Sequence, residues 1–192
     1  MPKKSIREQI LARRKHLPAE VCLRDSLLAQ ERLMATSEFA SAGAVALYSP
    51  IWNELFTEEV GREALKRGKR VAYPRVSNQG LEFVEIEARS ELTPGAYGIL
   101  EPTGCKILPV ASIDMIVVPG VAFDIRGGRL GYGKGFYDRV LHRRMAGRLV
   151  GLCYELQVVE HLPIETHDVL MDLVITERRI VRPATRVARH SL

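Results

Sequence analysis

The stretch PGVAFDIRGGRLGYGKGFYDRVL, residues 119–141, decides how this chain is organised, because it joins an apolar strand to a helix through a run rich in glycine. Glycine stands at positions 127, 128, 131, 133 and 135, and it allows a positive φ and close approach of a ligand. Backbone N–H groups of such a loop converge on an anion, and the positive end of the following helix adds to the attraction. The composition predicts a phosphate-binding loop, with a nucleotide or another phosphorylated ligand as its guest.

The glycine-rich run departs from both standard phosphate-binding motifs. Residues 128–134 satisfy the spacing G-x-x-x-x-G-K, but Gly135 stands where that motif needs a serine or threonine to hold magnesium. Phe136 stands where the dinucleotide pattern G-x-G-x-x-G needs its third glycine. A magnesium nucleotide bound here needs another oxygen ligand, and Asp138 is the nearest candidate. The alternative is that the glycines form only a flexible turn.

Length and composition indicate one soluble globular domain. The chain has 192 residues, of which 46% are hydrophobic and 27% charged. No apolar run approaches the roughly 20 residues of a membrane span, and the N-terminus is charged and amphipathic, so we expect a cytoplasmic protein without a membrane partner. The three cysteines, at positions 22, 105 and 153, are too widely spaced for a metal site or a disulfide framework.

The net charge of +5 raises the possibility of a nucleic-acid partner. Much of the excess lies in residues 1–15 and after residue 178, and no nucleic-acid-binding motif is present. Small polyanions, such as a nucleotide and a polyglutamylated cofactor, are attracted by the same positive field. We therefore expect small-molecule partners and no nucleic acid.

Short apolar runs alternate with helical patterns along the chain. Helices are expected over residues 5–17, 19–36 and 57–67, and strands over 44–48, 70–73, 81–87, 114–118, 149–153 and 173–176. The strand at 81–87 reads as an edge strand, and the first two helices together are expected to cover a sheet face. The pattern predicts an α/β fold, a three-layer α/β/α sandwich with a mostly parallel, mixed central sheet of the Rossmann-like kind.

The whole chain, residues 1–192, is expected to form a single domain. The N-terminal helices occupy residues 1–40, and a basic tail, solvated or disordered, occupies residues 179–192. Ligands of such folds gather at the carboxyl ends of the strands. Tyr48, residues 74–75, Pro119 and the glycine-rich run would all emerge there.

Basic residues gather at the start of the chain. Lys3, Lys4 and Arg7 lie within one turn of the first helix, and Lys3 and Arg7 share a face at the i, i+4 spacing. Two cations side by side suit an anionic ligand, although a solvated helix start is the commoner meaning of such a run. From the residues alone, both interpretations stay open.

Two acidic candidates lie outside the glycine-rich run. Glu54 follows the strand 44–48 among apolar residues, and its structural alternative is a loop carboxylate or a capping partner for Thr57. Glu58 is the alternative candidate if Glu54 is not the functional carboxylate of this segment. The pair His167-Asp168 precedes the strand 173–176, where such a pair is usually structural or exposed.

The run PGVAFDIRGGRLGYGKGFYDR resembles the signature of the 5-formyltetrahydrofolate cyclo-ligase family, also called methenyltetrahydrofolate synthetases. Weaker features agree with the family in their order along the chain: residues 3–7, 47–50, 53–57, 68–69, 73–76, 98–102, His167-Asp168 and 173–177. The resemblance spans nearly the whole chain, and only the glycine-rich run is highly specific.

The resemblance implies an enzyme that uses ATP and Mg²⁺ to close 5-formyltetrahydrofolate to 5,10-methenyltetrahydrofolate, releasing ADP and phosphate. In the family's scheme the formyl oxygen is phosphorylated to an iminium phosphate, and no covalent nucleophile of the enzyme is required. The implied partners are ATP and the folate, including its polyglutamylated form, and the protein is expected to be a monomer or weak dimer.

The resemblance also assigns roles to residues. It makes Lys134 and Arg129 catalytic through stabilisation of charge on the transferring phosphoryl group. It assigns ATP binding to Lys3, Lys4, Arg7, Arg129, Leu130, Gly131, Tyr132, Gly133, Lys134, Gly135, Phe136 and Tyr137. It assigns substrate binding to Tyr48, Glu54, Tyr132, Gly133, Lys134, Gly135 and Phe136. It makes Asp138 and Asp168 the magnesium ligands. A structural alternative is that Asp124 pairs with Arg129 and closes the loop.

Two other classes of protein fit parts of the pattern. A non-catalytic sensor of a nucleotide or phosphometabolite would keep the glycine-rich run without ATP turnover. Glu54 and Asp168 are the residues that distinguish the enzyme from such a sensor. A nucleic-acid-binding protein would use the basic residues 178–189 and show steeply salt-dependent binding.

Overall fold

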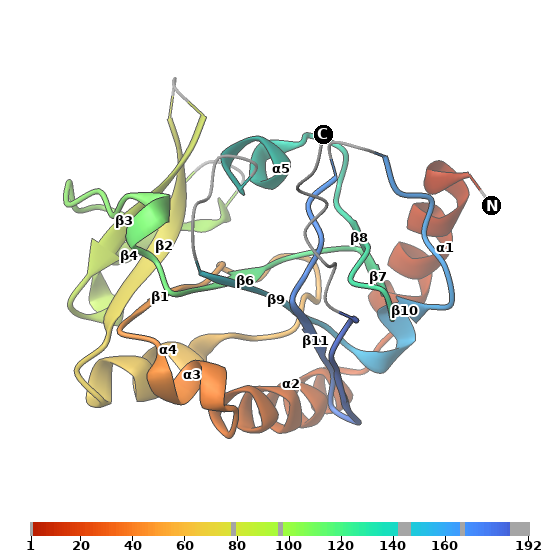
Figure 1. Ribbon diagram of the computed structural model, residues 1–192, viewed down its shortest axis with the longest axis horizontal. Coiled ribbons are helices and arrows are strands. Elements are labelled where there is room, and N and C mark those ends of the chain that lie inside the picture. The colour runs from red at the N-terminus through yellow and green to blue at the C-terminus, as the bar shows by residue number, and fades with distance from the viewer. Residues whose placement is uncertain (1, 78–79, 96–97, 142–146, 166–167, 185–192) are drawn as a thin grey trace, which may run out of the picture.

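The computed structural model describes residues 2–77, 80–95, 98–141, 147–165 and 168–184, and its centre is a seven-stranded sheet (Figure 1). The strand order is β12-β11-β9-β6-β1-β2-β3. Five strands run parallel: β1 (Ala44–Ala46), β2 (Arg70–Ser77), β6 (Met115–Val118), β9 (Arg148–Leu152) and β11 (Leu173–Ile175). The edge strands β3 (Gly80–Ile86) and β12 (Ile180–Val181) are antiparallel. The expected mixed, mostly parallel sheet and its edge strand over residues 81–87 are confirmed.

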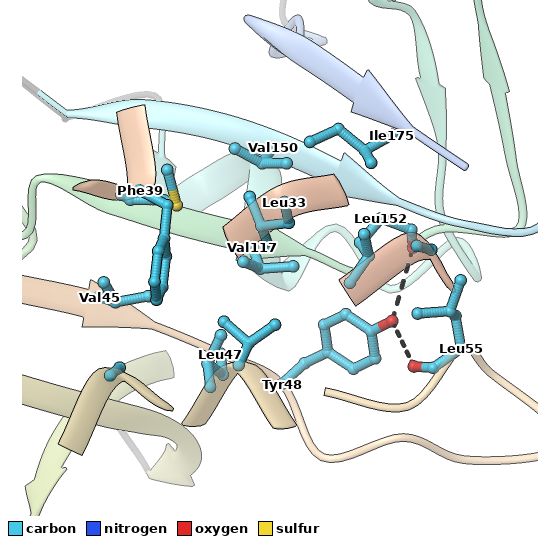
Figure 2. Close-up of a cluster of buried hydrophobic side chains, with 14 of the residues drawn as sticks. Leu33, Phe39, Val45, Leu47, Tyr48, Leu55, Val117, Val150, Leu152 and Ile175 are labelled. Carbon is cyan, nitrogen blue, oxygen red and sulfur yellow. Dashed lines mark hydrogen bonds between the residues drawn. The ribbon is translucent and has the colours of Figure 1, made fainter. Parts of the chain in front are cut away.

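Helices α2 (Ala19–Met34), α3 (Ser37–Ser41) and α4 (Glu58–Lys66) cover one face of this sheet (Figure 1). Leu33 of α2 and Phe39 of α3 pack in one buried cluster with Val45, Val117 and Val150 of three neighbouring strands (Figure 2). Strands buried on both faces read as continuous apolar runs, which is why these were recognisable in the sequence.

The opposite face carries α5 (Phe136–Leu141) and a three-stranded sheet of β10 (Val158–Val159), β7 (Ala122–Asp124) and β8 (Arg129–Leu130). Phe123 and Leu141 pack there against Val118 and Val174 of the central sheet. The layers are therefore helices, sheet, and a mixed layer of one helix and a small sheet. The remaining elements are β4 (Leu92–Pro94), β5 (Leu100–Pro102) and the 3₁₀ segments Arg89–Glu91, Val110–Ser112 and Glu155–Gln157.

The position of the first helix differs from the prediction. Helix α1 (Lys3–Lys15) does not cover the central sheet with α2, but lies beside β7, β8 and β10 (Figure 1). Ile6 and Ile10 pack in a separate cluster with Val121, Leu130 and Leu162. The apolar stripe of α1 is narrow and suits this small sheet, whereas a helix on a large sheet face needs a broader stripe. Its basic N-terminal end consequently lies at the glycine-rich run.

The hairpin of β7 and β8 was not predicted, because the residues between Phe123 and Arg129 read as a loop. Asp124, which is fully buried, holds its turn. One carboxylate oxygen accepts from the N–H groups of Arg126 at 2.9 Å and Gly128 at 2.8 Å, and the other from Leu162 at 2.9 Å. Asp124 is thus bound to backbone amides, and the alternative in which it closes the loop by pairing with Arg129 is wrong.

Two glycines of the run serve this turn rather than a phosphate. Gly127 has a φ of 84°, and a Cβ there would lie 2.5 Å from the carbonyl oxygen of Met171. A Cβ at Gly128 would lie 2.8 Å from the Asp124 carboxylate. The prediction that these two glycines bind a ligand is therefore corrected, and the loop open to a ligand shortens to residues 131–135.

The C-terminal segment is more ordered than expected. Residues 180–181 form β12 on β11, and Arg182 pairs with Glu38 of α3. The prediction of a tail from residue 179 is wrong for this part, and residues 185–192 lie outside the described residues. Among the described helices, none is both long enough and apolar enough to cross a membrane.

Replacing Asp124 by alanine should lower the free energy of unfolding by about 3 kcal/mol, because three backbone amide donors, two of them buried, lose their acceptor. Urea denaturation of the purified variant measures the change. Asp124→Asn keeps one acceptor oxygen and should fall between the wild type and Asp124→Ala. An unfolding free energy of Asp124→Ala equal to that of the wild type would contradict the assigned role.

Candidate active site

The candidate site lies where the chain order of the parallel strands reverses. Along the sheet these strands stand in the order β2-β1-β6-β9-β11, so the connections after β1 and β6 leave in opposite directions. Ligands of open α/β sheets bind at this point, outside the carboxyl ends of the strands. The loop after β1 carries Glu54, and the chain after β6 leads through the hairpin to loop 131–135. The topology therefore predicts that the two meet.

A hydrogen bond joins these two segments. The hydroxyl of Tyr132 donates to Oε1 of Glu54 at 2.8 Å. The other carboxylate oxygen, Oε2, accepts from the N–H of Ile51 at 3.1 Å. The glycine loop and the predicted substrate-binding carboxylate, 78 residues apart in the sequence, are thus in direct contact.

Arg14 of α1 completes this group, and sequence reasoning missed it. Its Nη2 donates to the Tyr132 hydroxyl oxygen, and its guanidinium lies 5.8 Å from the centre of the Tyr132 ring. The signal was present in the sequence: Ile6, Ile10 and Arg14 follow one another at intervals of four on the buried stripe of α1. A charged residue at a buried position of a helix needs a polar partner.

Burial governs the ionisation of this group. Glu54 is only 4% exposed, and this burial raises the pKa of its carboxyl above the ordinary value of 4.5, against an opposing effect of the positive charge of Arg14. Burial also raises the pKa of the Tyr132 phenol, and the negative charge of Glu54 adds to the rise. Tyr132 therefore remains a neutral hydrogen-bond donor to Glu54.

The loop preceding Glu54 has an uncommon backbone. Trp52 and Asn53 both have positive φ, 47° and 58°, a conformation that costs free energy for residues other than glycine. The Trp52 ring is 71% exposed and contacts the Tyr132 ring edge-on, with centroids 5.6 Å apart. Strain of this kind concentrates at functional sites, so it supports assigning the loop to a site.

Helix α1 contacts the glycine loop directly. Nε of Arg7 donates to the carbonyl oxygen of Gly131 at 3.0 Å. Gly133 and Gly135 have φ values of 99° and 65°, which side-chain-bearing residues rarely adopt. Lys134 between them is exposed. The structure thus brings the basic helix start, a positive-φ loop and a lysine together.

Two further cations of the predicted nucleotide site are bound to carboxylates. Lys3 Nζ lies 2.8 Å from Asp168 and 2.9 Å from Glu165. The side chain of Arg129 is 4% exposed; its Nη2 donates to Asp138 at 2.7 Å and its Nη1 to the carbonyl oxygen of Pro119 at 3.1 Å. Arg129 therefore ties the end of β6 to α5.

The two predicted magnesium ligands are these same carboxylates. Asp138 is neutralised by Arg129 and Asp168 by Lys3, and the Asp168 oxygen bound by Lys3 also accepts from the N–H of Glu165 at 2.9 Å. Within the part of the chain that the structure describes, no group of three or more His, Cys, Asp or Glu side chains could hold a metal. The side chains alone therefore form no ready magnesium shell, and magnesium binding stays a prediction.

Other predicted site residues occupy less direct positions. Tyr48 is buried, and its hydroxyl donates to the carbonyl oxygen of Leu55 at 2.7 Å (Figure 2), so it supports the residue that follows Glu54. The Leu130 side chain packs under α1. Glu58, the second choice for Glu54, pairs instead with Arg89 at 3.0 Å.

The remaining predicted residues lie on the surface or at the start of α5. Lys4 is exposed on α1, and Phe136 and Tyr137 begin α5. The Tyr137 ring lies 5.9 Å from the Arg129 guanidinium. His167 lies outside the described residues.

These features define a class of protein: an α/β domain with a ligand site at the strand-order reversal, where a glycine loop and several cations meet a buried carboxylate. The chain belongs to the 5-formyltetrahydrofolate cyclo-ligase family, whose sequence profile matches residues 1–177. The predicted family membership, the α/β fold class and the expectation of an enzyme are thereby confirmed.

Individual relatives agree over most of their length. The chain is 33% identical over 159 residues to the 5-formyltetrahydrofolate cyclo-ligase of Escherichia coli K12, covering 79% of this chain and 87% of that protein. It is 28% identical over 189 residues to the mouse 5-formyltetrahydrofolate cyclo-ligase, covering 91% and 93%.

Solved structures show the same fold. The NMR structure of Aquifex aeolicus 5,10-methenyltetrahydrofolate synthetase superposes with a TM-score of 0.86 at 35% identity, covering 100% of both chains. The synthetase from Mycoplasma pneumoniae gives a TM-score of 0.75 at 27% identity, covering 92% of this chain and 99% of that one.

Glu54 should make the stability of this protein depend on pH. Because its pKa is raised by folding, the folded protein keeps this proton at pH values where the unfolded chain has released it. The contribution to stability therefore declines as pH rises from about the ordinary value of 4.5 through the folded pKa. Glu54→Gln removes this decline and should be more stable than the wild type at neutral pH.

Urea denaturation of wild type and Glu54→Gln across the acidic to neutral range tests this expectation. Glu8→Gln, which removes an exposed carboxylate from α1, serves as the control. The same pH dependence in wild type and Glu54→Gln would count against an elevated pKa of Glu54.

Proposed function

We propose that this enzyme converts 5-formyltetrahydrofolate to 5,10-methenyltetrahydrofolate with ATP and Mg²⁺, releasing ADP and phosphate. The bond between Tyr132 and Glu54 carries the proposal, because it joins a phosphate-type loop and a buried carboxylate into one site for two substrates. The names of the relatives from Escherichia coli and Aquifex aeolicus supply the reaction.

We place the phosphates of ATP over loop 131–135. Its backbone N–H groups and the cations of Lys3, Lys4, Arg7 and Lys134 would surround them. Three residues would act by fixing the backbone of the loop: Leu130 and Tyr137, which pack in apolar clusters, and Phe136, which begins α5.

The ion pairs of the site suggest how it receives ATP. Phosphate oxygens would compete with Asp168 for Lys3 and with Asp138 for Arg129, since all are anions in reach of the same cations. The two carboxylates would then face the Mg²⁺ that accompanies the nucleotide, whose chemistry is to neutralise phosphate charge. On ATP binding, Lys3 and Arg129 would thus exchange carboxylates for phosphates. Asp138 and Asp168 would exchange these cations for Mg²⁺.

The folate would occupy the side of Glu54. A carboxylate accepts about four hydrogen bonds, and the protein uses one on each oxygen, so each oxygen can accept another. The amino and ring N–H groups of an aminopyrimidinone present two adjacent donors to such a carboxylate. Tyr48 would act indirectly through Leu55, and residues 132–136 would close the site between the two substrates.

The reaction requires activation of a formamide oxygen. That oxygen would attack the γ-phosphorus of ATP, the bond from phosphorus to the β-phosphate oxygen would break, and ADP would leave. Nitrogen 10 would then add to the iminium carbon, lose its proton, and expel phosphate. Lys134 and Arg129 would stabilise charge on the transferring group, and positioning would supply the remainder of the rate.

Mixing the protein with 5-formyltetrahydrofolate, ATP and Mg²⁺ should produce the ultraviolet absorbance of the methenyl product, with one ADP formed per ring closed. Omitting ATP, or removing Mg²⁺ with a chelator, should abolish the signal. Absence of the absorbance with all components present would refute the proposed reaction, and ADP release without it would indicate another substrate.

Lys134→Ala should reduce kcat/KM by at least about 100-fold, as expected when one donor to a developing charge is lost. Its thermal unfolding should match the wild type because the side chain is exposed. Lys66→Ala, which removes an exposed lysine from α4 on the opposite side of the sheet, is the control and should retain full activity. Wild-type turnover in Lys134→Ala would exclude a catalytic role.

A further inference from the structure

Arg14 has hydrogen-bonding groups that the protein does not use. The residue is 1% exposed, and its Nε and Nη1 have no hydrogen-bond partner among the described residues. Only Nη2 is bound, to the Tyr132 hydroxyl. A buried charged donor without an acceptor is costly, so its retention beside an active site points to a ligand that supplies the acceptor.

The unused donors of Arg14 lie next to unused acceptors. The Tyr132 hydroxyl oxygen accepts from Arg14 on one side and donates to Glu54 on the other. Glu54 can accept one more hydrogen bond on each carboxylate oxygen. One phenol oxygen therefore separates a guanidinium with spare donors from a carboxylate with spare acceptors.

This pattern matches one edge of a 2-amino-4-oxopyrimidine ring. Such a ring presents, in order, an amino donor, a ring N–H donor and a carbonyl acceptor. Building on the proposed function, we propose that Arg14 binds the ring carbonyl oxygen of the folate while Glu54 accepts from the amino and ring N–H groups. Arg14 is thereby assigned as a substrate-binding residue that reads the substituent at position 4.

The Tyr132 hydroxyl occupies the position between the two groups. Tyr132 stands between Gly131 and Gly133, and the φ of Gly133 is 99°, so the backbone on both sides has the freedom of glycine. Its ring is half-buried: it packs against the cluster that contains Ile6 and Ile10, lies 5.8 Å from the Arg14 guanidinium, and meets the edge of the exposed Trp52 ring. Rotation of Tyr132 away from Glu54 would open the place for the ring.

The test compares two ligands that differ in the substituent at position 4 and in the proton on the neighbouring ring nitrogen. The second difference is the same for the wild type and for each Arg14 variant, so it cancels when their ratios are compared. One is 5-formyltetrahydrofolate, and the other is its 4-amino analogue, which offers donors where the first offers a carbonyl acceptor. Trp52 is the only tryptophan of the chain and lies against Tyr132, so its fluorescence reports binding without turnover. The measured quantity is the ratio of the two dissociation constants.

Arg14→Gln should change this ratio by about tenfold or more in favour of the 4-amino analogue, because the glutamine amide can pair with either substituent. Arg14→Lys keeps the charge but has a single compact donor group, and should shift the ratio in the same direction by less. Arg13→Gln, an exposed neighbour on α1, should leave the ratio as in the wild type.

A role of Arg14 in stability alone would weaken both ligands equally and leave the ratio unchanged. The assignment is therefore overturned if either variant keeps the wild-type circular dichroism spectrum and shows an unchanged ratio. Arg14→Lys is the more conservative change, so it provides a folded variant if Arg14→Gln does not fold. If the wild type converts 5-formyltetrahydrofolate but the Arg14 variants leave the ratio of dissociation constants unchanged, only the role of Arg14 is refuted and the proposed function stands. Failure of the wild type to bind or convert 5-formyltetrahydrofolate refutes the proposed function and this inference with it.

Discussion

The site depends on one hydrogen bond, from the Tyr132 hydroxyl to the buried Glu54 carboxylate. Each residue comes from a different connection of the sheet: Glu54 lies in the irregular loop after β1, and Tyr132 follows the β7–β8 hairpin after β6. The reversal of strand order between β1 and β6 brings the connections together, and the hydrogen bond fixes their register. Arg14 adds a third segment, so three parts of the chain meet at one oxygen atom.

Charge is distributed around this point in pairs. Lys3 lies between Asp168 and Glu165, and Arg129 pairs with Asp138, whereas Arg7 donates to the carbonyl oxygen of Gly131 and keeps its charge beside the loop. The site therefore keeps a modest positive potential without leaving several buried cations unpaired, which would be costly. An incoming polyanion can form further ion pairs by taking over the paired cations.

Local patterns in the sequence predicted the elements whose burial is continuous or periodic. The apolar runs at β1, β6, β9 and β11 and the positive-φ glycines at positions 133 and 135 belong to this group. The hairpin of β7 and β8 could not be predicted, because Gly127 and Asp124 take their roles from Met171 and Leu162, which lie far along the chain. Arg14 was recognisable only as a charge on a buried stripe, and its partners required the fold.

The docking of α1 on the small sheet places the beginning of the chain beside the site. Lys3 already contacts Asp168, and Pro2 precedes it as the first described residue. An affinity tag fused ahead of Pro2 would therefore emerge next to the loop at 131–135, and a polyhistidine or acidic tag there would bring its own charge and metal affinity to the candidate nucleotide site.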